Sequence, residues 1–313
     1  MKTLRIGTRG SALALWQAHH VAQRLAEAQG VNSEIVRIRT SGDQLQSAAQ
    51  SQTGVGIGLK GIFIKEIEDA LLAGAIDLAV HSMKDVPTQI PRGLEFPAIM
   101  EREDARDCLI SREGRKLNEL RAGARVGTSS LRRQAQLRHH RPDLSVVDLR
   151  GNVDTRLKKL DAGEFDAIVV AAAGVSRLGF ADRITQIFDE DFMLPAVGQG
   201  SLGIETRSSD PDTSAIVARL DDLAARACVT SERALLHELQ GGCQVPLGAW
   251  ARLVLGELHL EAAVFSLDGR EFARCDESGD PADPDELGSR LGTILIEAGA
   301  DRILRLIDRT ASG

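Results

Sequence analysis

Short apolar runs alternate with segments of helical periodicity along the N-terminal part of the chain. Residues 4–8 predict a strand, and residues 12–29 carry apolar side chains at helical spacing. A second strand is predicted at 34–40, a helix at 62–72 and a buried strand at 75–82. Regular alternation of strands and helices is typical of an α/β domain.

The same pattern begins again in the middle of the chain. A strand that runs into Thr128-Ser129-Ser130 and then a helix repeats the arrangement of the first strand, the turn Arg9-Gly10-Ser11 and the first helix. The segment 163–169 likewise has a residue pattern similar to that of 74–80. Two repeated patterns in the same order predict two similar α/β domains. Their ligand-binding edges would face each other across a cleft.

Beyond about residue 221 the pattern changes to that of an α+β domain. A short helix with Thr230 as its hydroxyl cap is predicted before Gly241, followed by strands near 248–255 and 258–267. One helix over 284–307 is predicted to close the chain. The predicted domains are 1–98 with 199–218, 104–194, and 221–313.

The segment 41–61 interrupts the first α/β pattern. It is rich in Gly, Ser and Gln, and its only charged residues are Asp43 and Lys60. A polar, glycine-rich stretch of this length inside a globular protein favours a lid or binding loop over a simple connector.

Composition narrows the classes of function. The 313 residues are 43% hydrophobic and 27% charged, and the formal net charge of -7 argues against a general nucleic-acid binder. The first residues carry no secretory signal pattern, and the longest apolar run, 167–175, is about half the length that crosses a bilayer. We expect a cytoplasmic protein that binds neither membrane nor nucleic acid.

The four cysteines are far apart and form no C-x-x-C pair. Neither a disulfide framework nor a zinc site is indicated, so no metal is expected. The cysteines are Cys108, Cys228, Cys243 and Cys275.

Arginines recur at the predicted strand ends and helix starts of both α/β domains. Any one of them is more often a solvated surface residue. Together they predict a cationic cleft, because the guanidinium group binds carboxylate or phosphate through two hydrogen bonds. The turn before the first helix adds an anion site, although Ser11 could simply cap that helix. The arginines are Arg9, Arg132, Arg133, Arg150, Arg156 and Arg177.

Two further residues are candidates for chemistry. Cys243 follows two glycines and precedes a proline, a backbone context that can present a thiol, although a lone cysteine is usually a small buried hydrophobe. Asp85 lies just after a buried strand beside Lys84. It either forms an ordinary ion pair or faces a cation that develops during a reaction.

Five motifs, in order along the chain, together resemble the porphobilinogen deaminase family, also called hydroxymethylbilane synthases. The resemblance extends from Arg5 to the end of the chain. The motifs are His81-Ser82-Met83-Lys84-Asp85-Val86-Pro87, Val126-Gly127-Thr128-Ser129-Ser130-Leu131-Arg132-Arg133, Leu149-Arg150-Gly151-Asn152-Val153, Leu194-Pro195-Ala196-Val197-Gly198-Gln199-Gly200 and Gly241-Gly242-Cys243-Gln244-Val245-Pro246.

The resemblance implies a fold and an activity. The fold is two α/β domains like those of type II periplasmic binding proteins, flanking a cleft, and a small α+β C-terminal domain that carries a cysteine. The activity is the head-to-tail condensation of four porphobilinogen molecules with loss of ammonia, followed by hydrolytic release of hydroxymethylbilane, for tetrapyrrole and haem biosynthesis. The primer is one covalent dipyrromethane cofactor per chain, and the family suggests a monomer.

The resemblance also implies roles for individual residues. Cys243 would hold the cofactor through a thioether, and Asp85 would bind the pyrrole N–H groups and stabilise the cationic azafulvene left when ammonia departs. Asp43 and Lys60 would belong to a mobile lid. The other implied cofactor-binding residues are Ser11, Lys84, Thr128, Ser129, Arg132, Arg133 and Arg150, and the implied substrate-binding residues are Arg9, Gln17, Arg156, Arg177 and Gln199.

The sequence departs from the family pattern in the lid. Gly56 stands where many relatives carry a second lysine, and Leu59 where a glycine is common, which leads to the hypothesis of a more mobile lid. Two other classes of protein remain as alternatives: a non-catalytic anion-binding protein with the same two-domain cleft, and a transcriptional effector domain. Cys243 argues against the first, and the lack of a basic helix-turn-helix segment argues against the second.

Overall fold

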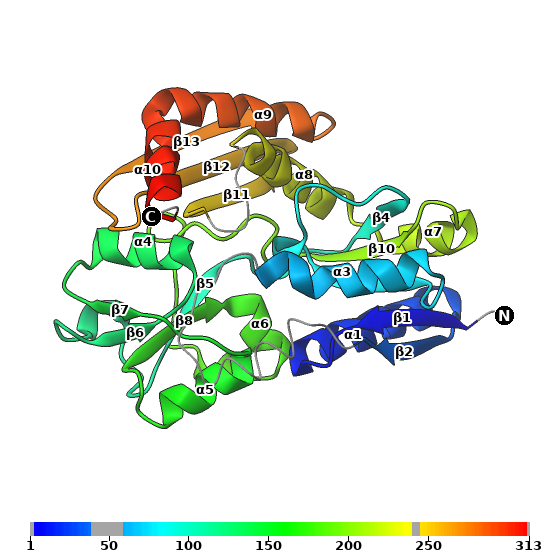
Figure 1. Ribbon diagram of the computed structural model, residues 1–313, viewed down its shortest axis with the longest axis horizontal. Helices are drawn as coiled ribbons and strands as arrows, with labels where there is room; N and C mark the ends of the chain where they lie inside the picture. The colour runs from blue at the N-terminus through cyan, green and yellow to red at the C-terminus, as the bar shows by residue number, and fades with distance from the viewer. Residues whose placement is uncertain (1–2, 39–58, 240–244, 312–313) are drawn as a thin grey trace. The chain divides into compact units, whose positions relative to one another are not determined.

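The computed structural model describes residues 3–38, 59–239 and 245–311 (Figure 1). The chain forms two compact units, and each is described by itself. The first consists of Met1–Arg102 and Ser201–Arg226, and the second of Glu103–Gly200 and Ala227–Gly313. Asp43, Gly56 and Cys243 lie outside the described residues.

The first unit is built on a five-stranded sheet with the order β2-β1-β3-β10-β4. The central strand β1 pairs in parallel with β2 and β3, whereas β10 runs antiparallel to both β3 and β4. The strands are β1 (Leu4–Thr8), β2 (Ser33–Arg37), β3 (Leu78–Ser82), β4 (Leu94–Ile99) and β10 (Leu202–Arg207).

Helices bury both faces of this sheet. Val21 and Leu25 of one helix pack against Leu4 and Ile6, and Ile67 of another packs on the opposite face. Strands covered on two faces read as nearly continuous apolar runs, which is why the sequence predicted them. The helical elements are α1 (Ala12–Gln29), α3 (Leu59–Leu72), η1 (Met83–Asp85), α7 (Pro211–Val217) and η4 (Ala218–Leu220).

Helix α1 begins and ends where the sequence predicted. The Oγ atom of Ser11 accepts a hydrogen bond from the backbone N–H of Ala14 at 3.3 Å, and Gly30 closes the helix with a φ of 65°. Two other predicted bounds were wrong. Helix α3 begins at Leu59 instead of residue 62, and β3 begins at Leu78 instead of 75, because the preceding residues close α3 with a turn.

The second unit contains a sheet with the matching order β7-β6-β8-β5-β9. Strand β6 is parallel to β7 and β8, and β5 is antiparallel to β8 and β9, so the two sheets correspond strand for strand. The predicted pair of α/β folds is confirmed. The strands are β5 (Asp107–Ser111), β6 (Arg125–Gly127), β7 (Ser145–Val147), β8 (Ala167–Ala171) and β9 (Gln186–Ile187).

Helix α4 (Leu131–His140) begins directly after the predicted turn Thr128-Ser129-Ser130. The helical elements are η2 (Leu117–Glu119), α4 (Leu131–His140), α5 (Val153–Asp161), α6 (Ala172–Arg177) and η3 (Ala181–Arg183).

A three-stranded antiparallel sheet follows in the order β11-β12-β13, and helices pack on it around a core that includes Leu235, Leu260 and Leu291. The predicted small α+β fold is confirmed. The elements are α8 (Leu223–Glu238), β11 (Leu247–Val254), β12 (Glu257–Phe265), β13 (Phe272–Gly279), α9 (Pro284–Leu295), η5 (Ile296–Ala300) and α10 (Asp301–Ala311).

Two helix predictions in this region were wrong. Thr230 is not a helix cap, because α8 begins seven residues earlier, where Asp222 accepts a hydrogen bond from Ala225 N–H at 2.7 Å. The single closing helix is interrupted, because Gly299 has a φ of 104° and separates α9 from α10 by one π-helical turn.

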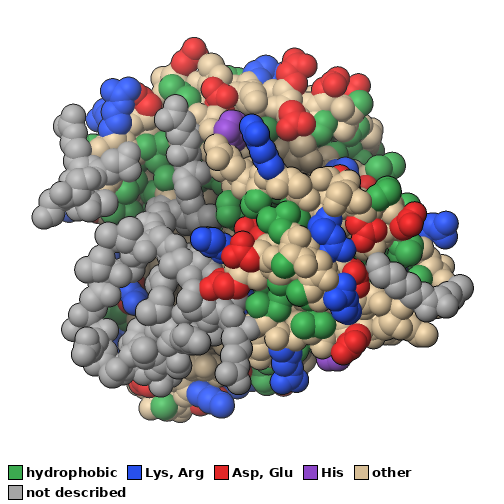
Figure 2. All heavy atoms as spheres, turned by 45° about the vertical axis from the view of Figure 1, so that its right-hand side comes forward, with side chains coloured by type: hydrophobic (Ala, Val, Ile, Leu, Met, Phe, Trp, Pro, Cys, Tyr) green, Lys and Arg blue, Asp and Glu red, His purple; other side chains and the backbone are tan. Residues whose placement is uncertain are grey.

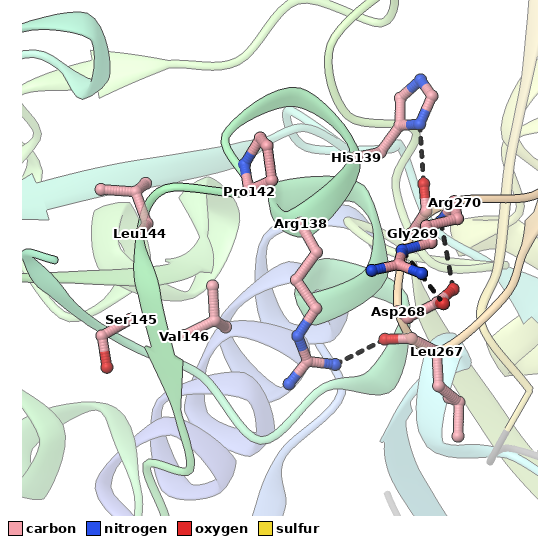
Figure 3. Close-up of a pocket in the computed structure, with 10 residues that line it drawn as sticks. All are labelled: Arg138, His139, Pro142, Leu144, Ser145, Val146, Leu267, Asp268, Gly269 and Arg270. Atoms are coloured by element: carbon pink, nitrogen blue, oxygen red, sulfur yellow. Dashed lines mark hydrogen bonds and ion pairs between the residues drawn. The ribbon is translucent and has the colours of Figure 1, made fainter. Parts of the chain in front are cut away.

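The turn between β12 and β13 lies directly against the C-terminal end of α4 (Figure 3). Arg138 donates to the carbonyl of Leu267 at 2.6 Å, and His139 Nδ1 lies 2.8 Å from the carbonyl oxygen of Gly269. A Cβ atom at Gly269 would come within 2.6 Å of the backbone nitrogen of His139. The backbone of the third sheet is therefore seated on α4 without room for a side chain.

Candidate active site

The first part of the predicted site is the turn between β1 and α1. Ser11 caps α1, as its alternative interpretation anticipated, and Arg9 and Ser11 are both half-buried. Thr8, at the end of β1, donates its hydroxyl hydrogen to the carbonyl of Ala14. A capped helix start beside an arginine retains the positive end of the helix dipole, so the capping role of Ser11 and an anion site are compatible.

The second part lies where β3 ends. Gln17 of α1 donates to the hydroxyl of Ser82 at 2.9 Å and is itself 5% exposed. Lys84 and Asp85 follow in η1, and both are half-buried. The structure therefore brings the start of α1 and the Asp85 turn together within the first unit, with Gln17 as the direct link.

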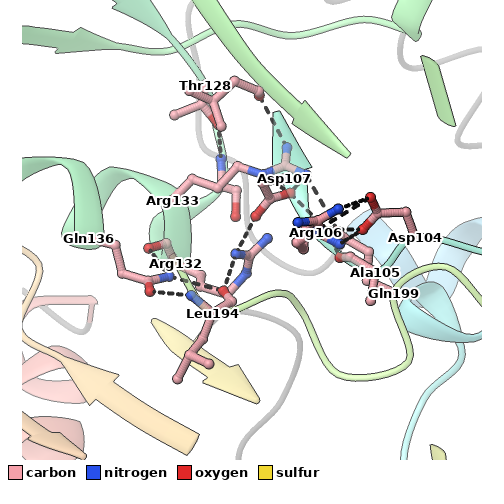
Figure 4. A network of polar contacts seen from close by, with 12 residues as sticks. Asp104, Ala105, Arg106, Asp107, Thr128, Arg132, Arg133, Gln136, Leu194 and Gln199 are labelled. Atoms are coloured by element: carbon pink, nitrogen blue, oxygen red, sulfur yellow. Dashed lines mark hydrogen bonds and ion pairs between the residues drawn. The ribbon is translucent and has the colours of Figure 1, made fainter. Parts of the chain in front are cut away.

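The second unit holds a buried cluster of two arginines around Asp107 (Figure 4). Arg132 Nη1 lies 2.6 Å from Asp107 Oδ2, and Arg133 Nη2 lies 2.7 Å from Asp107 Oδ1. Asp107 is fully buried, and the two arginines are 4% and 6% exposed. Two guanidinium groups against one carboxylate leave a net positive charge in this cluster, which favours a further anion.

Burial alone would raise the pKa of Asp107, because it penalises the charged carboxylate. The charges and hydrogen bonds of Arg132 and Arg133 reverse that effect and hold the pKa well below its ordinary value. Burial lowers the pKa of Arg132, and Asp107 opposes this shift. The three groups are therefore electrostatically dependent on one another.

Gln199 completes the cluster. Its side-chain amide donates to Asp107 Oδ1 at 2.9 Å and to the carbonyl of Ala105 at 2.7 Å. Its amide oxygen lies 3.5 Å from Arg133 Nη2. Gln199 is 1% exposed, so its observed contacts orient the arginine cluster.

Hydroxyl groups lie at the start of α4. Thr128 is fully buried, and its Oγ1 accepts a hydrogen bond from Ser130 N–H at 3.3 Å. The Oγ atom of Ser129 is buried and has no hydrogen-bond partner among the described residues. A buried hydroxyl without a partner is costly, and a polar ligand would satisfy it.

The remaining predicted arginines of this unit differ in exposure. Arg150 is exposed, Arg156 donates to the carbonyl of Gly151 at 2.7 Å, and Arg177 donates to the carbonyl of Gly200 at 2.7 Å. Burial lowers the pKa of Arg177, and the charge of Glu103 opposes the shift. Arg150 precedes Gly151 in the turn that leads into α5, and Arg156 lies in the first part of α5 and reaches back to that turn.

Three predicted residues cannot be placed. Asp43 and Cys243 lie outside the described residues, and Lys60 lies in the first turn of α3, where side chains are not described. Helix α8 ends at Glu238 and β11 begins at Leu247, so the described chain brackets Cys243 on both sides.

Sequence reasoning missed four buried acids: Asp77, which pairs with Arg5 of β1, and three others. Asp107 is the first residue of β5, and Glu205 lies within β10. Glu232 lies in α8, and its two carboxylate oxygens accept backbone N–H groups from Gly198 and Ala251. All four are at most 1% exposed. The sequence signal that could have indicated burial of Asp107 and Glu205 is the position of each acid at the edge of an apolar run.

A pocket of about 840 Å³ lies elsewhere in the second unit, beside the β12–β13 turn (Figure 3). Arg138, Ser145 and Arg270 are among its lining residues, and none of its lining residues was predicted to bind cofactor or substrate. On the face seen in Figure 2, basic and acidic side chains are interspersed.

Within the described ranges, no group of three or more His, Cys, Asp and Glu side chains is arranged to hold a metal ion. No helix in the same ranges has the length and apolar character needed to span a membrane.

Comparison with known proteins identifies the family. The model of the "Porphobilinogen deaminase, dipyromethane cofactor binding domain" matches residues 4–215, and that of the "Porphobilinogen deaminase, C-terminal domain" matches 226–297. A porphobilinogen deaminase of Syntrophobacter fumaroxidans is 48% identical over 309 residues, 98% of this chain and 99% of that protein. One of Desulforudis audaxviator is 51% identical over 304 residues, 96% of each.

Among solved structures, the methionine binding protein MetQ matches 70% of this chain and 89% of its own, with 14% identity and a TM-score of 0.44. The two family models cover nearly the whole sequence in the expected order. The chain belongs to the porphobilinogen deaminase family.

Proposed function

We propose that this chain is a hydroxymethylbilane synthase, a transferase that condenses four porphobilinogen molecules head to tail on a dipyrromethane cofactor. Each condensation releases ammonia, and hydrolysis finally frees hydroxymethylbilane. The observation that carries the proposal is the match of residues 4–215 to the cofactor-binding domain of the family. The surplus positive charge of the Arg132, Arg133 and Asp107 cluster supports it, because each pyrrole ring of substrate and cofactor bears two carboxylates.

The described residues fit a polyanionic cofactor. The buried Oγ of Ser129 has no hydrogen-bond partner in the described chain, and it adjoins the arginine cluster at the start of α4. Cys243 would hold the cofactor through a thioether, one per chain. When bound, dipyrromethane supplies the pyrrole carbon to which the first substrate unit is joined. Its other proposed ligands are Ser11, Lys84, Thr128, Ser129, Arg132, Arg133 and Arg150.

The residues proposed to bind substrate have side chains that end in hydrogen-bond donors. Arginine at a strand end can take a carboxylate through two parallel hydrogen bonds, and a neighbouring amide can add a third. Asp43 and Lys60 are proposed to contact substrate as parts of a lid. The proposed substrate-binding residues are Arg9, Gln17, Arg156, Arg177 and Gln199.

Asp85 is proposed as the catalytic residue. Departure of ammonia from porphobilinogen leaves a cation, and a carboxylate fixed in place before the reaction stabilises that charge as it develops. The same carboxylate can accept the pyrrole N–H groups and assist proton transfer. Asp85 lies in a short turn whose first residue, Met83, donates its backbone N–H to the carbonyl of Ser201, and this anchoring supports the role.

The finer features of the enzyme are also proposals. We infer three domains, 1–98 with 199–218, 104–194, and 221–313, and the three separate sheets support this division. We also infer a cytoplasmic monomer that acts without membrane or nucleic acid. The formal net charge of -7 supports the absence of nucleic-acid binding.

Intact-protein mass after denaturation tests the function. Protein purified from cells that make porphobilinogen should retain the covalent mass of a dipyrromethane group, and the Cys243→Ser variant should lack it. Cys275→Ser is the matched control, because Cys275 is partly exposed but belongs to β13. An unmodified wild-type chain would refute the cofactor assignment and would favour a non-catalytic anion-binding protein.

A further inference from the structure

His81 and Glu205 form a buried hydrogen-bonded pair in the first unit. His81 Nε2 lies 2.9 Å from Glu205 Oε2, and the two residues are 5% and 1% exposed. The ring of Phe96 lies edge-on to His81, with centroids 5.9 Å apart. Two polar groups withdrawn from water in this way must satisfy each other, so their mutual geometry is tightly constrained.

The pair joins two neighbouring strands. His81 of β3 lies opposite Gly203 of β10, and Glu205 is two residues farther along β10, on the same face of the sheet. A diagonal contact of this kind fixes the register of two antiparallel strands, because a slip of one residue would turn one side chain to the other face.

The turn with Asp85 rests on the same stretch of β10. Met83 donates its backbone N–H to the carbonyl of Ser201 at 3.1 Å. A Cβ atom at Gly203 would come within 2.2 Å of Met83 Sδ, so the thioether occupies the space above that glycine. Met83 is 3% exposed. The location of η1 therefore depends on how β3 and β10 are aligned.

We propose that His81 and Glu205 are positioning residues for the condensation: their contact fixes the end of β3 against β10 and thereby places Asp85. This inference rests on the proposed function only for the role of Asp85. The alignment of η1 on β10 stands on the contacts alone.

One more acid faces the pair. Glu68 of α3 is half-buried, and its pKa is raised by burial and by the negative charge of Glu205, while His81 opposes this shift. Removing the His81 side chain would leave Glu205 buried beside Glu68 and without its hydrogen-bond partner. The rearrangement that relieves this repulsion would occur at the end of β3, four residues before Asp85.

The experiment compares two substitutions of the same residue. In His81→Gln the side-chain amide nitrogen can take the place of Nε2, whereas in His81→Asn the side chain is one carbon shorter and cannot reach Glu205. We expect His81→Asn to lower kcat about ten- to a hundredfold, with KM for porphobilinogen within about twofold, and His81→Gln to restore most of kcat. Equal, wild-type kcat in both variants would overturn the proposal.

Hydrogen exchange gives a readout that needs no activity. The amide hydrogen of Met83 is bonded to the carbonyl of Ser201 in the neighbouring chain segment, and that of Val86 is bonded to the carbonyl of Met83 within the turn. They should exchange faster in His81→Asn and at the wild-type rate in His81→Gln. Unchanged exchange in His81→Asn would contradict the positioning role even if the proposed function were wrong. Failure of the wild type to form hydroxymethylbilane would instead contradict the function alone.

Two controls separate positioning from simple loss of stability. Val21→Ala weakens the core on the α1 side, where Val21 is fully buried, without touching the pair. The urea midpoint and kcat of Val21→Ala are compared with those of His81→Asn. If both variants lost the same amount in urea midpoint and the same factor in kcat, the proposal would fail. Glu205→Gln retains an oxygen that can accept from Nε2–H, so its kcat should stay within about threefold of wild type. A hundredfold loss in Glu205→Gln would also overturn it.

Discussion

Asp107 accepts two hydrogen bonds from Arg133, from Nε at 3.0 Å and from Nη2 at 2.7 Å, in a place where the carboxylate has no exposure to solvent. This two-point contact fixes the plane of the guanidinium group. Arg132 contacts the other carboxylate oxygen, so one buried acid orients both arginines proposed to bind the cofactor.

Replacing Asp107 by asparagine should destabilise the protein strongly. The variant leaves two buried guanidinium groups without a counter-charge, which should cost about 3–5 kcal/mol in the free energy of unfolding. Urea denaturation measures the change. Asp104→Asn is the control, because the Asp104–Arg106 pair is about one third exposed and should contribute less than about 1 kcal/mol. Similar losses in the two variants would contradict the proposed importance of burial.

The contribution of Asp107 should depend on pH in a defined direction. Its pKa in the folded protein lies well below the ordinary value of about 3.9, so unfolding takes up a proton near pH 4. The stabilisation is complete above about pH 5 and is lost as the pH falls toward the folded-state pKa. The difference in unfolding free energy between wild type and Asp107→Asn should therefore narrow below about pH 4. A constant difference from pH 7 to pH 3 would show that the charge is not responsible.

Asp85→Asn should keep the fold and lose turnover. The amide has nearly the shape of the carboxylate but cannot neutralise a developing cation, so kcat should fall by about two to three orders of magnitude. Steady-state kinetics with porphobilinogen, with circular dichroism to confirm folding, measures this. Near-normal turnover would assign Asp85 to a structural ion pair.

Gly203→Ala should displace the turn that carries Asp85. The added Cβ would lie 2.2 Å from Met83 Sδ and 2.9 Å from Phe96, and relief of this overlap should cost about 1–3 kcal/mol. Gly279→Ala is the control, since its Cβ would make only ordinary contacts, 3.4 Å or more from Leu287. Both are measured as urea midpoints. Equal stability of the two variants would mean that Met83 moves to relieve the overlap at no cost in the free energy of unfolding.

The thiol of Cys108 should be unreactive in the native protein. Burial, and then the nearby charge of Asp107, raise its pKa to about 12, so very little thiolate forms at pH 8. Iodoacetamide at that pH should modify the partly exposed Cys275 well before Cys108, as peptide mass analysis would show. Faster labelling of Cys108 would indicate that β5 opens in the native state.

Local signals predicted the elements that they control. Ser11 and Gly30 set the ends of α1 by their own backbone and side-chain chemistry, so both were readable from sequence. The repeated α/β pattern was readable for the same reason, because each buried strand needs a continuous apolar run. The start of α8 was not, since Thr230 and Asp222 are both acceptable caps and packing decided between them.

Long-range polar contacts could not be predicted from local patterns. Asp107 meets Arg132 and Arg133 only because β5 runs antiparallel beside β8, and no spacing within the sequence records that pairing. The pairing of His81 with Glu205 joins residues 124 positions apart. Arg132 and Arg133 were predicted to contact an anionic ligand, and the carboxylate that they contact in the structure belongs to the protein itself.

The close fit of Gly269 against α4 limits how this protein can be recombined with its relatives. The β12–β13 turn and the last turn of α4 share a surface with no spare volume, so a chimera that takes one from each parent would pair surfaces that never evolved together. A crossover after Arg102, which keeps both segments from one parent, should give folded progeny more often than a crossover that falls between them.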